Sequence, residues 1–295
     1  MGRISELRDL IIKKNDPELN AYLDILIDPE SETNLKLTEF AGLKEILHSN
    51  EWPPAVDPTL ICDPNSEEDK INRAEGILEL LIEENLKGKK FLDFGCGEGH
   101  IPLKAIDQNT TLSVGYDINE DPHWNEFRNK GVTLTNDMKV VESQAPYDVI
   151  LIYDVIDHAT LEEVKQIMVK VKSLLSNKGT VYLRAHPFCS RHATHLYHKL
   201  NKAYVHLVFT EEELAEMGYE SPVNAKILFP ISQYEKIFKE AGLKVQSSNV
   251  LRERIEDTPF KKNTLVKNRI KQHFPNVKDY PSFQCEQQFL DYILK

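Results

Sequence analysis

The sequence predicts an α/β fold built on a doubly wound, mostly parallel sheet. From Lys90 onward, short apolar runs alternate with helical patterns, and this alternation is typical of parallel sheets. The run VILI within 147–154 is apolar at consecutive positions, as expected for a central strand covered by helices on both faces. With 295 residues, of which 41% are hydrophobic, the chain can bury such a core and still carry accessory segments.

The chain divides into a helical N-terminal part and the domain that holds the sheet. Over residues 1–67 we predict a helical extension and connector, because apolar residues recur at helical spacing as far as Leu47 and prolines then gather in 52–69. Residues 68–295 form the second predicted domain. A long segment without clear strands, at about 186–230, is expected to be an insert after the fifth strand.

The elements of the second domain follow from its local patterns. A helix is expected at 68–86, where an acidic first turn suits the helix dipole. Strands are expected at KFLDF (90–94), TLSVGYD (111–117), VTLTND (132–137), YDVILIYD (147–154), GTVYLRA (179–185) and LKVQSSNVL (243–251). Further helices are expected at 161–175 and 231–242, and the Asn-Lys-Gly after the first of them is a stop signal.

A glycine-rich turn, FGCGEGH, follows the first strand. Gly95, Gly97 and Gly99 permit positive φ and let the backbone approach a ligand closely. A dinucleotide-binding GxGxxG loop is the nearest alternative, but His100 stands where its third glycine would fall, and Asp93 would repel a pyrophosphate. S-adenosylmethionine (SAM) carries an amino group and a sulfonium and no phosphate, so an acidic neighbour suits it.

Two further acids end the next two strands. Asp117 is placed to accept hydrogen bonds from both hydroxyls of a ribose, as an acid at this position does in nucleoside-binding α/β folds. Asp137, followed by Met138, is placed to bind an adenine amino group and to pack on the base, although a plain turn aspartate is an equal alternative.

Together these motifs resemble the class I SAM-dependent methyltransferases. LDFGCGEG is similar to the first motif of the family, YDIN to its ribose motif, ND followed by Met to its adenine position, and YDVILIYDVIDHAT to its fourth motif. The resemblance covers about 75–185 and 231–253 and implies a seven-stranded Rossmann-like sheet with SAM as cofactor. It also implies a SAM site lined by Asp93, Gly95, Gly97, Gly99, Asp117, Ile118, Asp137, Met138 and Asp154.

The segment after the fifth strand is expected to recognise the methyl acceptor, because ligands bind at the carboxyl edge of open α/β sheets. Methyl transfer needs a general base only when the nucleophile must lose a proton. His158 and His186 are the candidates for that base, and Arg191 is the candidate for holding an acidic or phosphate group of the acceptor.

Histidines crowd the same segment. His192, His195 and His198 recur at i, i+3 spacing, but no Asp or Glu joins them, and such spacing rarely supplies three ligands to one ion. The sequence therefore predicts no metal site.

The acceptor is expected to be a small molecule. The net charge of −11 disfavours proteins that rely on phosphate attraction. RNA, methylated at a ribose 2′-oxygen with the help of Asp154, Arg184 and the basic stretch 252–278, stays the alternative, although such enzymes carry Lys where Arg184 stands. A catalytically silent SAM-binding protein that associates through its N-terminal helices is a third reading.

A cytoplasmic protein without membrane association is expected. No apolar run approaches the roughly 20 residues that span a bilayer, and the N-terminus lacks the pattern of a secretory signal. The four cysteines include no CxxC pair, so neither a disulfide framework nor a zinc knuckle is indicated.

Overall fold

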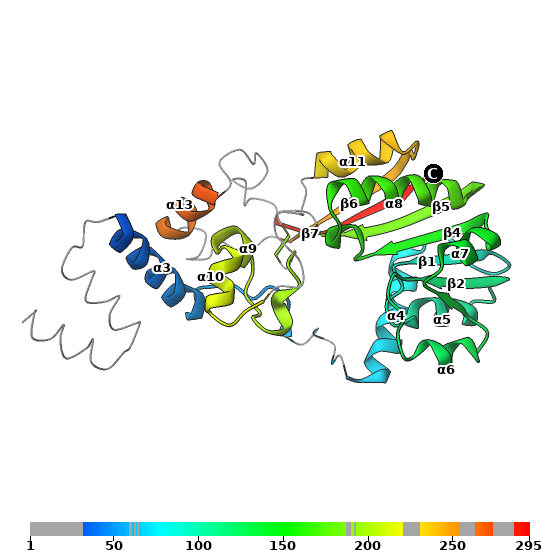
Figure 1. Ribbon diagram of the computed structural model, residues 1–295, viewed down its shortest axis with the longest axis horizontal. Coiled ribbons are helices and arrows are strands. Elements are labelled where there is room, and N and C mark those ends of the chain that lie inside the picture. The colour runs from blue at the N-terminus through cyan, green and yellow to red at the C-terminus, as the bar shows by residue number, and fades with distance from the viewer. Residues whose placement is uncertain are drawn as a thin grey trace, which may run out of the picture. The chain divides into compact units, whose positions relative to one another are not determined.

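The computed structural model of the protein describes residues 32–58, 61, 63, 65–186, 190–191, 193–220, 231–253, 263–273 and 286–295 (Figure 1). The chain forms two compact units, one with helices α3 and α13 and one with the whole sheet. The helical periodicity expected between residues 4 and 26 lies outside the described residues.

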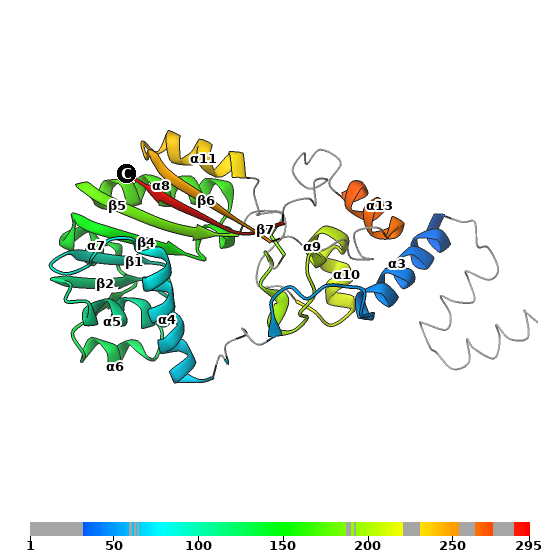
Figure 2. The same ribbon diagram turned by 180° about the vertical axis from the view of Figure 1, so that it is seen from behind.

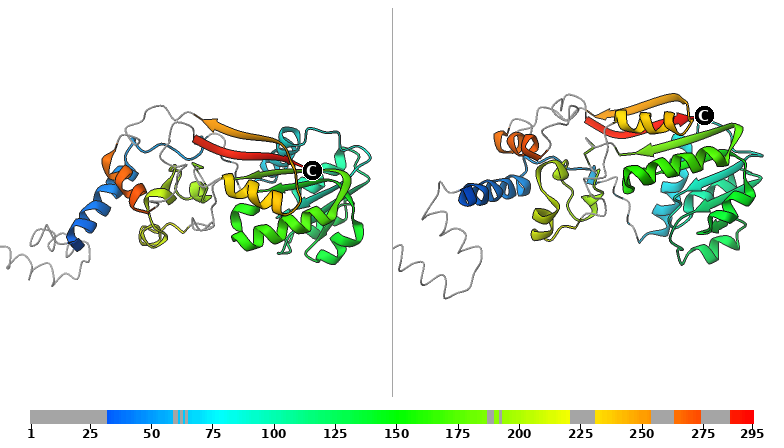
Figure 3. Two further views of the ribbon diagram at one scale, coloured as in Figure 1. Left: turned by 90° about the horizontal axis from the view of Figure 1, so that it is seen from above. Right: turned by 45° about the horizontal axis from the view of Figure 1, so that its top comes forward.

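A seven-stranded sheet forms the centre of the larger unit, in the order β3-β2-β1-β4-β5-β7-β6. The strands are β1 (Lys90–Phe94), β2 (Leu112–Tyr116), β3 (Thr133–Thr135), β4 (Tyr147–Tyr153), β5 (Leu175–Ala185), β6 (Val245–Glu253) and β7 (Glu286–Leu294). Neighbouring strands from β3 to β5 are parallel, whereas β7 runs antiparallel to both β5 and β6 (Figure 3). The predicted doubly wound, mostly parallel α/β fold is confirmed.

Helices cover both faces of the sheet (Figures 1 and 2). They are α4 (Glu67–Leu81), α5 (His100–Asp107), α6 (Trp124–Arg128), α7 (Met138–Gln144), α8 (Leu161–Leu174) and α11 (Ile231–Glu240). Alternate residues of β4 point to opposite faces of the sheet. Ile150 and Ile152 belong to the core that includes side chains of α7, α8 and α11, whereas Val149 and Leu151 belong to the core that includes side chains of α4 and α5. None of the described helices is long and apolar enough to cross a membrane.

The junction between α8 and β5 differs from the prediction. A capping box between Thr160 and Glu163 begins α8, which ends at Leu174, and the chain enters β5 at once instead of forming a loop. The register of β5 against β4 shifts between Tyr147 and Val149. Gly179 lies at this irregularity, where a Cβ atom would be 2.9 Å from the Tyr147 carbonyl oxygen. The glycine therefore permits close backbone approach inside the strand, not a helix stop.

The segment after β5 forms short helices: η3 (Leu196–His198), α9 (Val205–Val208) and α10 (Glu211–Glu216). The side chains of Leu196, Leu207 and Leu214 are buried. Asn201 joins this insert to the connector before α4, because its side chain accepts a hydrogen bond from the Val56 nitrogen (2.9 Å) and donates one to the Val56 oxygen (2.8 Å).

The smaller unit contains α3 (Glu32–His48) and α13 (Thr264–His273). These helices contact each other, and Arg269 Nη1 lies 3.6 Å from Glu39 Oε2. Leu43 and Leu47 of α3 are fully buried, in agreement with the helical spacing expected there.

A buried ion pair joins β5 to β7. Arg184 donates from Nε and Nη2 to the two carboxylate oxygens of Asp291, each at 2.6 Å. Only 5% of the Arg184 side chain and 18% of the Asp291 side chain is exposed. This geometry is the strong, bidentate form of an arginine–carboxylate pair.

Replacing Arg184 with Met is expected to lower the free energy of unfolding by about 3–5 kcal/mol, because it leaves the Asp291 carboxylate buried without its partner. Urea unfolding followed by circular dichroism would measure the loss. The double variant Arg184→Met/Asp291→Leu is the control and should be more stable than Arg184→Met, because it removes both charges. Equal stability of the single variant and the wild type would contradict the prediction.

Candidate active site

The glycine-rich turn between β1 and α5 depends on positive φ angles, which are 88° at Gly95, 50° at Gly97 and 92° at Gly99. The nitrogens of Gly95 and Cys96 both donate to the Tyr116 oxygen at the end of β2, at 2.7 and 2.9 Å. A Cβ at Gly95 would lie 2.2 Å from Val155 Cγ2, whereas one at Gly97 would meet no heavy atom within 4 Å. The turn is thus packed on its inner side at Gly95 and open at Gly97.

The predicted ribose and adenine acids lie at the ends of the neighbouring strands. Asp117 accepts hydrogen bonds from the Gly97 nitrogen (2.9 Å) and the Asn119 nitrogen (3.1 Å), so it also holds the glycine turn in place. The side chain of Ile118 is exposed. Asp137 is exposed and caps α7 by accepting from the Lys139 nitrogen (2.9 Å).

Met138 begins α7 and packs against the sheet core as a partly buried side chain. Asp137 and Met138 follow β3, which pairs with β2 so that the Asp117 nitrogen donates to the Thr135 oxygen at 3.3 Å. The side chains expected to bind the nucleoside therefore stand at one edge of the sheet, next to the glycine turn.

Asp93 is the most unusual residue of the turn. Its side chain is fully buried, and neither carboxylate oxygen has a hydrogen-bond partner among the described residues. Burial and, to a smaller extent, the nearby Asp117 raise its pKa against the opposing effect of Arg73, to about 8. A carboxylate with unfilled acceptor positions beside an open backbone cradle is suited to a cationic ligand.

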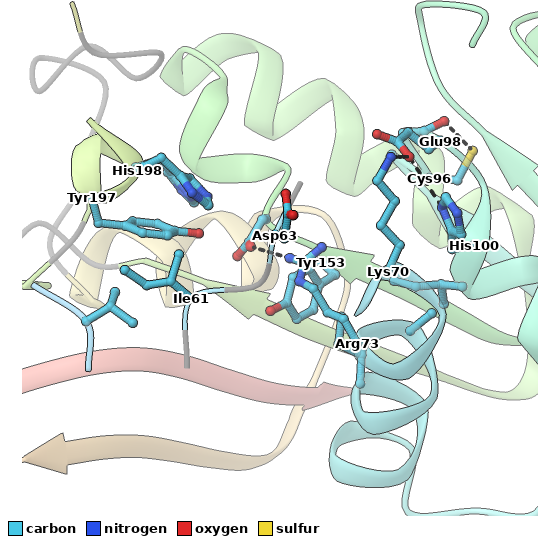
Figure 4. A pocket seen from close by; sticks show the side chains of 18 of the residues that line it. Ile61, Asp63, Lys70, Arg73, Cys96, Glu98, His100, Tyr153, Tyr197 and His198 are labelled. Atoms are coloured by element: carbon cyan, nitrogen blue, oxygen red, sulfur yellow. Dashed lines mark hydrogen bonds and ion pairs between the residues drawn. The ribbon is translucent and has the colours of Figure 1, made fainter. Parts of the chain in front are cut away.

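A cavity of about 580 Å³ opens beside the turn (Figure 4). Gly95, Gly97, Asp154 and His186 line it, as expected for site residues. The other lining residues are Val56, Ile61, Asp63, Lys70, Arg73, Ala74, Ile77, Cys96, Glu98, His100, Ile101, Tyr153, His195, Tyr197 and His198. Figure 4 shows Ile61, Tyr197 and His198 on one side, from the connector and the insert, and Lys70, Glu98 and His100 on the other.

The cavity wall formed by α4 was not predicted to take part. Lys70, Arg73, Ala74 and Ile77 line the cavity at helical spacing. Arg73 Nη2 lies 3.8 Å from Asp154 Oδ2, and its guanidinium lies 5.3 Å from the centre of the Tyr153 ring. A signal was present in the sequence, because Lys70 and Arg73 occupy the stripe of the helix that is otherwise apolar.

Three histidines and two aspartates meet where β4 and β5 end. His186 Nε2 lies 3.4 Å from Asp154 Oδ1, and His195 Nε2 lies 3.3 Å from Asp157 Oδ2. The His195 ring is 4.7 Å from the His186 ring and 4.9 Å from the His158 ring. We call these five residues the His–Asp cluster. The sequence indicated His158 and His186 singly, but Asp157 and the role of His195 appear only in the fold.

The His–Asp cluster perturbs the ionisation of its members. Burial opposes ionisation of Asp154, but the imidazoles of His186 and His195 together with Arg73 hold the pKa of that carboxyl well below its usual range. Burial lowers the pKa of His158, and His195 lowers it further, whereas Asp157 opposes the shift. At neutral pH the Asp154 carboxylate is therefore charged and the His158 ring is neutral.

Some of the predicted site residues lie outside the cavity wall. The predicted site residues that do not line the cavity, among the residues that the structure describes, are Asp93, Gly99, Asp117, Ile118, Asp137, Met138, His158 and Arg191. Arg191 Nη2 donates to the Pro54 oxygen at 2.7 Å, and its own oxygen accepts from the Tyr204 nitrogen at 2.8 Å. These contacts connect the insert to the chain before α4, and the acceptor-binding role of Arg191 stays a prediction.

A family model described as a methyltransferase domain matches residues 67–248. The chain belongs to this methyltransferase family. The match begins at the first residue of α4 and includes the glycine turn, the His–Asp cluster and part of β6. The cofactor of the methyltransferase is SAM, as predicted from the turn and the acids beside it.

Solved structures similar to the methyltransferase include a SAM-dependent methyltransferase from Clostridium acetobutylicum (13% identity, TM-score 0.47, covering 78% of this chain and 92% of that one). Magnesium protoporphyrin IX methyltransferase from Synechocystis is another (13% identity, TM-score 0.45, 86% and 99% covered). A third is a SAM-dependent methyltransferase from Mesorhizobium loti (12% identity, TM-score 0.43, 76% and 95% covered). No curated protein matches the chain.

The residues of the methyltransferase fit SAM. The buried, unpartnered Asp93 carboxylate suits the ammonium and sulfonium charges, and the open space at Gly97 leaves room for a ligand against the backbone. Asp117 is partly exposed at the adjoining strand end, where a ribose would bind.

Proposed function

We propose that the enzyme transfers the methyl group of SAM to a small-molecule acceptor bound against the His–Asp cluster. The observation that carries this proposal is the cavity itself, whose volume of about 580 Å³ falls in the range of small-molecule sites, about 300–1,000 Å³. It runs from the glycine turn, the proposed place of SAM, to His186 and His195, which leaves the histidine end for the acceptor.

The charges in the cavity support this choice over RNA. Lys70 forms an ion pair with Glu98 (2.6 Å), so its charge is already compensated. Arg73 faces Asp154 in the same way. A site for the sugar-phosphate backbone would instead present uncompensated cations.

Arg184, which the ribose-directed alternative requires at the acceptor, is engaged by Asp291 through both of its forked donors. About half of the basic stretch 252–278 lies outside the described residues. The small-molecule acceptor is therefore the better supported proposal.

The chemistry needs alignment more than acid–base catalysis. SAM supplies an electrophilic methyl carbon with a neutral thioether as leaving group. In this proposal the glycine turn and Asp117 position SAM at one end of the site, and His186 and His195 line the other end. Tyr153 and Arg73 contact each other beside Asp154, so their side chains shape the region between the two ends.

A methyl-transfer screen with labelled SAM against fractionated small molecules and fractionated RNA tests the proposal. We expect label in a small-molecule fraction, together with stoichiometric S-adenosylhomocysteine, and a rate that changes little between 50 and 200 mM salt, a range over which RNA binding falls by orders of magnitude. Label in RNA with a steep salt dependence would favour the RNA alternative. SAM binding without turnover in any fraction would favour a silent SAM-binding protein.

A further inference from the structure

We propose that Asp154, His186 and His195 bind a divalent transition-metal ion such as Zn²⁺. Their ligand atoms all lie within 4.8 Å of one another, although the three residues come from the end of β4, the end of β5 and the insert. Imidazole nitrogens with one carboxylate are a donor set typical of zinc and iron(II) sites, whereas Mg²⁺ and Ca²⁺ prefer oxygen ligands.

The spacing of the donors suits such an ion. Bonds of about 2.0–2.1 Å in tetrahedral geometry place two ligand atoms roughly 3.4 Å apart. His186 Nε2 and Asp154 Oδ1 are already 3.4 Å apart. The ligand atom of His195 lies within 4.8 Å of the other two, so it must approach them by at most about 1.4 Å to complete this geometry.

Both imidazoles have the supporting contacts that metal-binding histidines use. His186 Nδ1, on the side of the ring away from Asp154, lies 3.2 Å from Ser190 Oγ, and both residues are buried. His195 Nε2 lies 3.3 Å from a carboxylate oxygen of Asp157. Such contacts fix the orientation of the ring and the position of its proton.

The charge balance of the His–Asp cluster also favours a cation. The cluster holds two carboxylates, Asp154 and Asp157, and Arg73 Nη2 lies 3.8 Å from Asp154 Oδ2. One oxygen of the fully buried Asp157 has no hydrogen-bond partner among the described residues.

Backbone strain points to the same residues. Asp154 and His195 both have a φ of 53°, and only two other described residues apart from glycine have a positive φ. A non-glycine residue in this conformation costs on the order of 1–3 kcal/mol and is common at functional sites. Both strained residues belong to the three proposed metal ligands.

The site opens toward the cavity. Asp154, His186 and His195 line it, whereas Asp157 is fully buried behind them. The remaining coordination positions therefore face the space for the acceptor, and an oxygen atom of the acceptor would fill one of them. This use of the metal rests on the proposed function, but the presence of the metal does not.

The sequence predicted no metal because His192, His195 and His198 lack an acidic partner. His192 lies outside the described residues, and His198 lines the cavity without joining the cluster. The acid comes instead from the end of β4, much earlier in the chain.

Titration of the chelator-treated full chain with Co²⁺, followed by visible absorption, tests the proposal without SAM or acceptor. We expect one Co²⁺ per chain, displaced by one Zn²⁺, and a higher melting temperature with Zn²⁺. Asp154→Asn and His195→Asn should weaken binding at least a hundredfold, more than the loss of a supporting contact does. Asparagine tolerates positive φ, so both variants keep the backbone conformation.

His198→Ala is the matched control, because it removes a histidine of the same segment that lies outside the cluster, and it should bind Co²⁺ like the wild type. The absence of a Co²⁺ spectrum in the wild type would overturn the proposal. So would Co²⁺ binding by Asp154→Asn and His195→Asn that is as tight as binding by the wild type. A failure to bind metal would not contradict the proposed methyl transfer, because the acceptor screen measures methyl transfer independently of metal binding.

Discussion

Replacing Asp93 with asparagine is expected to weaken SAM binding by about ten- to a hundredfold, because a charge-assisted interaction of about 1.5–3 kcal/mol is lost. The same change should stabilise the cofactor-free protein at alkaline pH, since it removes a buried carboxylate that has no hydrogen-bond partner among the described residues. Isothermal titration with SAM and thermal melting without it measure the two effects.

The pH dependence of this variant follows from the pKa of Asp93, which is raised from 3.8 to about 8 in the folded protein. Between these two values the folded state holds a proton that the unfolded state has lost, so the stability contributed by this group falls as pH rises through that window. Compared with Asp93→Asn, the wild type should therefore lose melting temperature from about pH 5 to 8 and change little above about 8.

SAM binding should show the opposite trend. A cation beside Asp93 favours the ionised carboxylate, so the ratio of wild-type to Asp93→Asn affinity should rise by up to about tenfold per pH unit until about pH 8. Using the ratio cancels the titration of the SAM amino group itself. A ratio that stays constant from about pH 6 to 9 would show that Asp93 does not sense the bound cofactor.

Two alanine substitutions in the glycine turn should have different consequences. Gly95→Ala places a Cβ 2.2 Å from Val155 Cγ2 at a φ of 88°, so we expect a loss of stability of about 2–5 kcal/mol from strain and overpacking together. Gly97→Ala meets no protein atom within 4 Å and should cost only the backbone strain, about 1–2 kcal/mol. Urea unfolding separates the two variants.

SAM affinity completes this comparison. The Cβ of Gly97→Ala would occupy the open side of the turn, so we expect SAM affinity to fall by more than about tenfold although the fold is kept. Gly88→Ala is the matched control: it has a φ of 76° and open space around it, but it precedes β1, at the opposite end of that strand. If Gly88→Ala and Gly97→Ala weakened SAM binding equally, the turn would not be the SAM cradle.

Much of this architecture follows from local sequence patterns. The apolar runs at 90–94 and 147–154 locate central strands because parallel strands are buried on both faces. The turn FGCGEGH can be recognised in the sequence because glycine is the residue that adopts its three positive φ angles without strain. These are properties of neighbouring residues, which a single sequence displays directly.

What the sequence did not reveal depends on contacts between distant segments. The strand β7 was not predicted at any particular residues, because its sequence EQQFLDYIL lacks clear alternation and is stabilised by the partners on either side. Arg73 Nη2 comes within 3.8 Å of Asp154 Oδ2, 81 positions later in the chain, only in the folded structure. The pairing of Asp157 with His195, 38 positions apart, arises only when the insert folds back on the sheet.

The position of β7 between β5 and β6 also constrains the order of folding. Both of its partners precede it in the chain, and the Arg184–Asp291 pair joins residues 107 positions apart. Such non-local contacts form slowly, because a long loop must close before they stabilise the fold. Until β7 docks, the outer edge of β5 is an unpaired strand that can pair with another chain. Chaperone dependence and the yield of refolding should therefore respond most strongly to changes where β5 pairs with β7.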